Sequence, residues 1–369
     1  MGIFDFLKKK TAISSNEKHS EVIPKITIIS PVQASQEEVV PIEKIIQGKK
    51  PVCDGLYPHE ILVLSYAPKF CESGNKFQGF WWYKYGIKDV QDILNSLAKR
   101  GYIQRGTITD AINMEKIPTI KAELQKRNLA VSGKKEDLVN RLVNNVLESD
   151  LSSTFLRRPY SLTETGEKIL KKYEWIPFIH NHEIEDLGIW SLTEMMETPP
   201  YANYRDKIWG FLNQRGIEHI RNNNFGLYRN TRFTMSEFVA DEGKTKTAFS
   251  LLCEVIAYDL SGLSNGFQIK FLDIESRHYF PYEQSIVTMA PGITSRIKKL
   301  AEEFGWTDIE LQSQLITEMK KIELPFRLFT VEESADIVIA EIHKDQTKLK
   351  EVYSVAEKRF KKQYMAKRG

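Results

Sequence analysis

Residues 117–142, IPTIKAELQKRNLAVSGKKEDLVNRL, decide the local fold. Apolar side chains recur every three or four residues in its two halves, Ile117, Ile120 and Leu124 in the first and Leu138 and Leu142 in the second, and Val146 continues the second series beyond the stretch. This spacing is that of one face of a helix. The stretch therefore predicts two short amphipathic helices joined by an extended turn.

The turn contains residues suited to ending one helix and starting another. Asn128 tolerates the left-handed conformation in which many helices end. Ser132 offers a side-chain oxygen that can cap the second helix, and Gly133 permits close approach of another backbone. The unit is too small to bury much surface, so we expect its function to depend on the groups that it exposes.

The stretch presents positive charge. Between Glu115 and Arg141 there are seven basic and four acidic residues, a net charge of +3. Lys134 and Lys135 fall in the first turn of the second predicted helix, where positive charge opposes the helix dipole, so helix stability does not explain them. A phosphate bound there would use free backbone N–H groups, the dipole and both ammonium groups. The alternative is a solvated face, balanced by the acidic residues that follow.

The same segment resembles the SAP domain, a helix–extension–helix DNA-binding module. The resemblance lies in three blocks in the right order and spacing: ELQKRNL at 123–129, SGKKEDL at 132–138 and NRL at 140–142. Asn128 stands where the family usually has glycine. The resemblance implies contact with duplex DNA and no catalysis. The predicted DNA-binding residues are Lys121, Lys126, Arg127, Ser132, Gly133, Lys134, Lys135 and Arg141.

The bulk properties are those of an ordinary soluble protein of more than one domain. The chain has 369 residues, 41% hydrophobic and 27% charged, and its net charge of +3 leaves nucleic-acid affinity to local patches. Three scattered cysteines favour a reducing compartment. No apolar run is long enough for a membrane span or a secretion signal, so we expect a cytoplasmic protein without stable membrane insertion. The start, MGIFDFLKKK, is a short amphipathic piece.

Around the SAP-like unit, the sequence resembles a winged-helix domain at residues 54–175. Residues 59–66 predict a buried helix, and residues 86–100 predict a helix that stops at Gly101 before the strand-like Tyr102-Ile103. Residues 159–170 resemble the return strand and closing helix, with Ser161 and Glu164 as a capping box. The SAP-like unit, 112–147, would then be an insertion in the wing.

Two features of this domain have alternative interpretations. The exposed face of the helix at 86–100 carries Asp89 and Asp92, which would repel phosphates, so the domain can equally be a protein-interaction module. The aromatic cluster at 77–85 matches either a base-stacking platform or a small core, and core packing is favoured.

The remaining segments complete a mainly α fold. Residues 1–53 predict a flexible arm or linker, with one edge strand at 26–29. Residues 185–343 predict an all-α domain, a bundle or short solenoid, in which Thr307 with Glu310 and Thr330 with Glu333 start helices as capping boxes. Residues 344–369 carry nine basic and three acidic residues and predict a partly helical basic tail.

No segment predicts an enzyme, a cofactor or a metal site. Gly243-Lys244-Thr245 is similar to a phosphate loop, but Phe238 stands where that motif needs glycine. His180 and His182 have no further ligands in a recognisable frame.

Three hypotheses of function follow. The leading one is a non-enzymatic protein that grips duplex DNA with little sequence preference, with a possible protein partner for the C-terminal helical domain. The second is a protein-interaction scaffold. The third is a nuclease or other DNA-modifying enzyme with a site around His180, His182 or Asp241-Glu242. The layout also resembles uncharacterised phage and prophage proteins.

Overall fold

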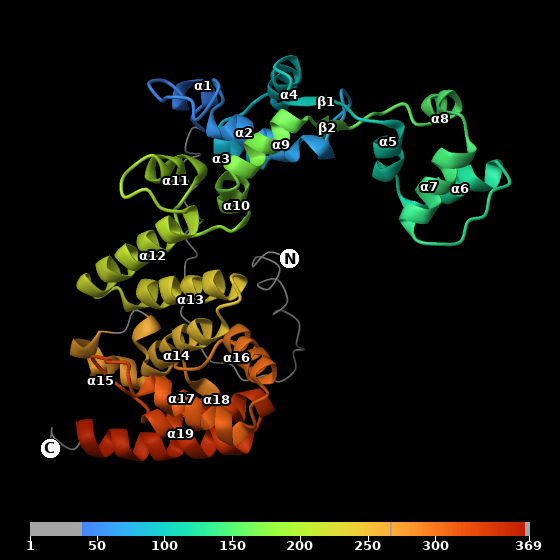
Figure 1. The fold of residues 1–369 in the computed structure, drawn as a ribbon. Helices are drawn as coiled ribbons and strands as arrows, with labels where there is room; N and C mark the ends of the chain where they lie inside the picture. Colours follow the sequence, from blue (N-terminus) through green and yellow to red (C-terminus); the bar gives the residue numbers. More distant parts are fainter. Residues whose placement is uncertain (1–38, 266–267, 366–369) are drawn as a thin grey trace, which may run out of the picture. The chain divides into compact units, whose positions relative to one another are not determined.

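The computed structural model describes residues 39–265 and 268–365. The predicted edge strand at 26–29 and the MGIFDFLKKK segment lie outside the described residues. The described chain is mainly helical, and its sheet consists of two short strands (Figure 1). The mainly α prediction is confirmed. In the described ranges, no helix combines the length and the apolar character that a membrane crossing requires.

Among the described residues, 39–47 and 77–88 belong to one compact unit, whose helices are α1 (Ile42–Ile45) and α3 (Phe80–Tyr85). Ile42 donates its backbone N–H to the carbonyl of Gly86 at 3.0 Å. Gly86 has φ 68°, and a Cβ there would lie 2.1 Å from the carbonyl oxygen of Val40, so only glycine fits. Within the predicted flexible arm or linker, residues 42–45 form a helical turn, because burial of Ile42 and this hydrogen bond hold it.

The aromatic cluster is divided between core and surface. Trp81 and Tyr85 are buried, whereas Tyr83 is 69% exposed. Burial of Trp81 and Tyr85 agrees with core packing as their main role.

The second unit includes a group of three helices and two strands. α2 (Pro58–Tyr66) contacts α4 (Val90–Lys99) and α9 (Glu164–Lys172). Strand β1 (Ile103–Arg105) pairs antiparallel with β2 (Tyr160–Leu162), and Gln104 lies opposite Ser161. These are the positions where strands were expected on either side of the inserted hairpin. The predicted cap of this helix is wrong: Thr163, not Ser161, accepts the N–H of Gly166 at the start of α9.

Four helices lie in the chain between β1 and β2: α5 (Ile108–Met114), α6 (Ile117–Lys126), α7 (Lys135–Asn145) and α8 (Glu148–Thr154) (Figure 1). They share a hydrophobic core. Its buried members are Ile108, Ala111, Ile112, Ile120, Leu124, Leu138, Val139, Leu142, Leu151 and Phe155. Since α5 and α8 contribute to this core, the folded unit extends beyond the predicted helical hairpin.

The rest of the chain is helical. After α10 (Trp175–Asn181), the helices are α11 (Ile189–Met196), α12 (Tyr204–Arg221), α13 (Phe225–Asp241), α14 (Thr245–Ser261), α15 (Leu272–Glu275), α16 (Pro291–Phe304), α17 (Asp308–Met319), α18 (Val331–His343) and α19 (Gln346–Phe360). α14 contacts α13, α16, α17 and α18 and buries most of its circumference, as expected of a helix at the centre of a core. The capping boxes at Thr307 and Thr330 are confirmed.

The predicted basic tail is wrong as a separate extension. α19 buries Leu349, Val352, Tyr353, Ala356 and Phe360 in the core of the C-terminal helices. The apolar spacing within the charged segment, rather than its net charge, determines its position. Several of its cations pair with acids: Lys350 with Glu283 at 2.8 Å, Lys361 with Glu357 at 2.6 Å, and Arg359 with Glu333.

Candidate nucleic-acid interface

The predicted apolar stripes form the inner faces of α6 and α7. Ile120, Leu124, Leu138 and Leu142 are each 0% exposed. Val146 packs against the same core from its edge. Ile117 is 43% exposed, so its inclusion in the buried stripe was wrong. As the first residue of α6, it lies at the helix end, where the core no longer covers it.

Asn128 ends the first helix as predicted. Its φ is 56°, in the left-handed region, and the N–H of Leu129 donates to the carbonyl of Leu124 at 2.9 Å. This geometry closes α6 and turns the chain into the extension at 129–134.

The start of α7 differs from the prediction. Lys134, not Ser132, is the N-cap residue, and its N–H donates to Asp137 Oδ2 at 2.8 Å. Gly133 has φ 118°, and a Cβ there would lie 2.9 Å from Asp137 Oδ2. The positive φ favours glycine, and the group closest to it is a side chain folded back from α7, whereas the sequence suggested a neighbouring backbone. Asp137, three residues after the N-cap, thus supplies the returning half of a capping box, whereas Ser132 lies two residues before the N-cap and has no capping role.

The first turn of α7 offers donors to a ligand. The backbone N–H groups of Lys135 and Glu136 meet no protein acceptor among residues 39–265 and 268–365. The exposed ammonium group of Lys134 pairs with no acid in the same ranges. Free N–H groups, the positive end of a helix dipole and an unpaired ammonium group are features that bind phosphate.

Lys135 has a different environment from Lys134. Its Nζ donates to the backbone carbonyl of Asn113 at 2.6 Å, near the end of α5. The two lysines are therefore not equivalent: one is open to solvent, and the other joins α7 to α5.

Lys126 and Arg127 both pair with Glu123, a buried carboxylate on α6. Lys126 Nζ lies 2.6 Å from Glu123 Oε1, and Arg127 Nη1 donates to Glu123 Oε2. Arg127 also donates to the hydroxyl of Thr154 on α8 at 3.3 Å. The hydrogen bond from Lys126, together with that from Arg127, holds the pKa of Glu123 below its usual range, although burial acts in the opposite direction.

Arg141 and Lys121, the other charged residues of the predicted set, also differ in whether a protein group binds them. Arg141 donates from Nη1 to the carbonyls of Ala130 and Ser132, at 2.5 Å and 3.0 Å. Lys121 has no acidic partner within the described chain and is partly exposed. All eight predicted residues lie in one hairpin, but only Lys121 and Lys134 have ammonium groups without a protein partner among the described residues.

Two residues that hold the hairpin together, Glu123 and Asp137, were missed as functional positions. The spacing of these two carboxylates in the sequence could have identified them. A carboxylate three residues after the N-cap is the second half of a capping box, and Glu123 precedes Lys126 and Arg127 by three and four residues.

The residues of the nuclease hypothesis have other partners. The hydroxyl of Tyr66 lies 2.9 Å from His180 Nε2, and His182 Nδ1 lies 2.8 Å from the carbonyl oxygen of Phe178. Arg205 lies 3.0 Å from Asp241 Oδ2 and 2.5 Å from Glu242 Oε1. In the part of the chain that the structure describes, no cluster of three or more potential metal-ligating side chains occurs.

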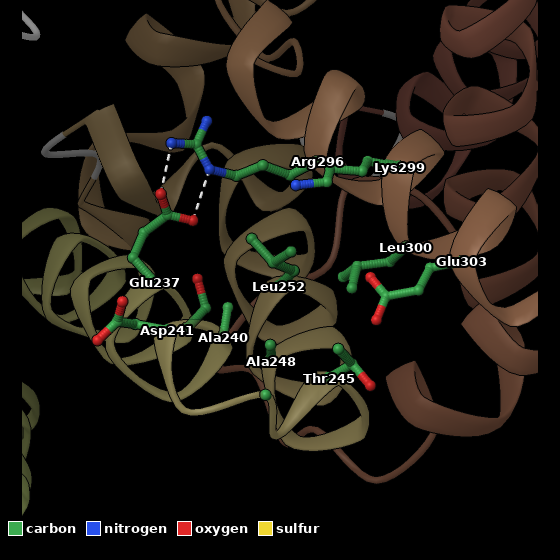
Figure 2. A pocket seen from close by; sticks show the side chains of 12 residues that line it. Glu237, Ala240, Asp241, Thr245, Ala248, Leu252, Arg296, Lys299, Leu300 and Glu303 are labelled. Carbon is green, nitrogen blue, oxygen red and sulfur yellow. Dashed lines mark hydrogen bonds and ion pairs between the residues drawn. The ribbon is translucent and has the colours of Figure 1, made fainter. Parts of the chain in front are cut away.

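The segment Gly243-Lys244-Thr245 lies beside a pocket of about 480 Å³ formed by α13, α14 and α16. Figure 2 shows Arg296 turned toward Glu237, to which it donates from Nε at 2.6 Å and from Nη2 at 2.5 Å. Lys244 pairs with Glu242 at 2.7 Å. The turn joins α13 to α14. Two of the neighbouring cations, Lys244 and Arg296, are already paired with carboxylates, whereas Lys299, which also lines the pocket, forms no ion pair within the described chain.

Comparison with known proteins locates one family in the chain. The family model described as SAP domain matches residues 116–146, within the interval predicted from the sequence. SAP domains are generally DNA-binding modules. No curated protein and no solved structure matches the chain. The resemblances to winged-helix domains and to phage proteins stay predictions.

Proposed function

We propose that this protein binds duplex DNA through its SAP domain, without catalysis and with little preference for sequence. The observation that carries the proposal is the first turn of α7, where the ammonium group of Lys134 and the N–H groups of Lys135 and Glu136 face no protein acceptor in the described chain. These groups recognise the backbone phosphates, which are the same in every sequence.

The elements on either side of the hairpin support the proposal that the host domain exposes the SAP unit. The four helices lie in the chain between two paired strands, β1 and β2, that follow α4 and precede α9. We propose that α2, α4, α9 and this strand pair form a winged-helix-like domain, with the SAP unit inserted in its wing. Such an insertion would present the unit away from the core of its host domain.

A non-enzymatic role is supported by the interactions of the competing candidate residues. Asp241 and Glu242 both accept from Arg205, and His180 lies at hydrogen-bond distance from the hydroxyl of Tyr66. The C-terminal helical domain is proposed to bind a protein partner, because it exposes apolar side chains near the α12–α13 turn and the segment before α15: Ile217, Leu227, Ile269 and Phe271 are each 45–50% exposed.

Lys134→Ala tests the DNA contact. We expect weaker binding to a short duplex, and the slope of log affinity against log salt should become shallower by about one unit, because one fewer counterion is released. Fluorescence anisotropy over a series of salt concentrations measures both quantities, and an unrelated duplex of equal length measures sequence preference.

Lys298→Ala is the matched control. Lys298 is also an exposed lysine, with its side chain 57% exposed, and lies on α16 of the C-terminal domain, where its Nζ is 4.0 Å from Glu302 Oε1. The substitution removes the same charge, and we expect wild-type affinity and slope. Equal slopes for the wild type and Lys134→Ala would show that the ammonium group of Lys134 does not contact phosphate.

A further inference from the structure

The extension between α6 and α7 has few hydrogen bonds of its own. Among the described residues, the backbone of 130–133 forms no backbone–backbone hydrogen bond. Its carbonyls at Ala130 and Ser132 instead accept from one guanidinium group, that of Arg141. The side chain of Val131, between them, packs against the hydrophobic core. Alternate residues of an extended chain direct equivalent groups to the same side, so one side chain from α7 can hold both carbonyls.

Asp137 holds the other end of the same extension. Its Oδ2 accepts the N–H of Lys134, one turn before Arg141 along α7. The extension is thus fixed by two side chains of the helix that it leads into. Because Arg141 holds Ser132 and Asp137 holds Lys134, the positions of Lys134 and of Gly133 between them follow from these hydrogen bonds.

We propose that Arg141 is a positioning residue for DNA binding: its guanidinium group clamps the carbonyls of Ala130 and Ser132, fixes the extension and so orients Lys134 and the first turn of α7 toward phosphate. This inference rests on the proposed function. It reassigns Arg141 from phosphate ligand to loop clamp, because its donation to the two carbonyls directs the guanidinium into the hairpin.

The salt dependence of binding separates the two roles. In Arg141→Ala the bound protein still makes the Lys134 contact with phosphate, but the extension must be ordered when DNA binds. Duplex binding should therefore weaken by about tenfold, the equivalent of one charge-assisted hydrogen bond, while the salt slope stays as in the wild type. Arg141→Lys keeps the charge and most of the stem but lacks the planar fork of donors. It should bind about as weakly as Arg141→Ala, whereas lysine would replace arginine well at a simple phosphate contact.

Arg327→Ala is the matched control, because Arg327 also donates from one guanidinium nitrogen to two backbone carbonyls, those of Met319 and Ile322, at the end of α17. We expect wild-type binding from this variant. Circular dichroism checks that each variant is folded. If Arg141→Ala does not fold, Arg141→Lys still tests the positioning role.

The outcomes distinguish the inference from the proposed function. A slope reduced by about one unit in Arg141→Ala, or wild-type affinity in either Arg141 variant, would overturn the positioning role while DNA binding stands. A wild-type protein that does not bind duplex DNA would overturn the proposed function itself.

Discussion

Arg229→Met is expected to lower the free energy of unfolding of the C-terminal helical domain by about 3–5 kcal/mol. Arg229 lies on α13 and donates to both oxygens of Asp259 on α14, at 2.8 Å and 2.7 Å. The two side chains are 14% and 9% exposed. Burial raises the pKa of Asp259 above its usual value even with Arg229 present, so an unpaired carboxylate at this position would be costly. Urea denaturation followed by circular dichroism measures the loss.

Arg296→Met is the control for this prediction. Arg296 forms the same kind of two-pronged pair with Glu237, but the side chains are 38% and 44% exposed. Both arginines also lie over the ring of Phe233. Solvent screens the exposed pair, so we expect a loss of about 0–1 kcal/mol. The double variant Arg229→Met/Asp259→Leu should recover most of the stability, since it leaves no buried charge unpaired. Equal losses in the two single variants would contradict the argument from burial.

Phe155→Ala is expected to destabilise the four-helix unit by about 3–5 kcal/mol. Phe155 directly follows α8, outside the 116–146 segment that matches the SAP family, yet it is 5% exposed and belongs to the same core as Leu124 and Leu142. Loss of its ring leaves a cavity beside residues of the hairpin. Hydrogen exchange of the α6 and α7 amides should accelerate by about a hundredfold or more, because each 1.4 kcal/mol corresponds to a factor of ten.

The neighbouring residue supplies the control for Phe155. Leu156 is 74% exposed, so Leu156→Ala removes an apolar side chain without opening a cavity, and exchange in α6 and α7 should stay at the wild-type rate. If Phe155→Ala also leaves these rates unchanged, α8 does not stabilise the hairpin, and the folded unit is limited to the family segment.

Local patterns in the sequence predicted much of the hairpin. The spacing of Ile120, Leu124, Leu138 and Leu142 identified the inner faces of α6 and α7, and Asn128 identified the end of the first helix. Such features depend on residues within one or two helical turns of each other, where periodicity and backbone preference are informative.

The partners of the charged residues could not be predicted in the same way. Lys135 contacts Asn113, and Arg127 reaches Thr154, across 22 and 27 positions of the chain. The cations of α19 pair with acids from distant segments, such as Glu283 and Glu333. Net charge counts these residues, but only tertiary packing decides which ammonium and guanidinium groups remain free.

Hydrogen exchange with and without a short DNA duplex tests the central claim most directly. Duplex bound at the start of α7 would cover the N–H groups of Lys135 and Glu136, so exchange in a peptide spanning 129–140 should slow, while peptides from α16 exchange as in the free protein. Protection confined to the C-terminal helices, or binding that leaves 129–140 unprotected, would contradict the assignment of DNA contact to the SAP domain.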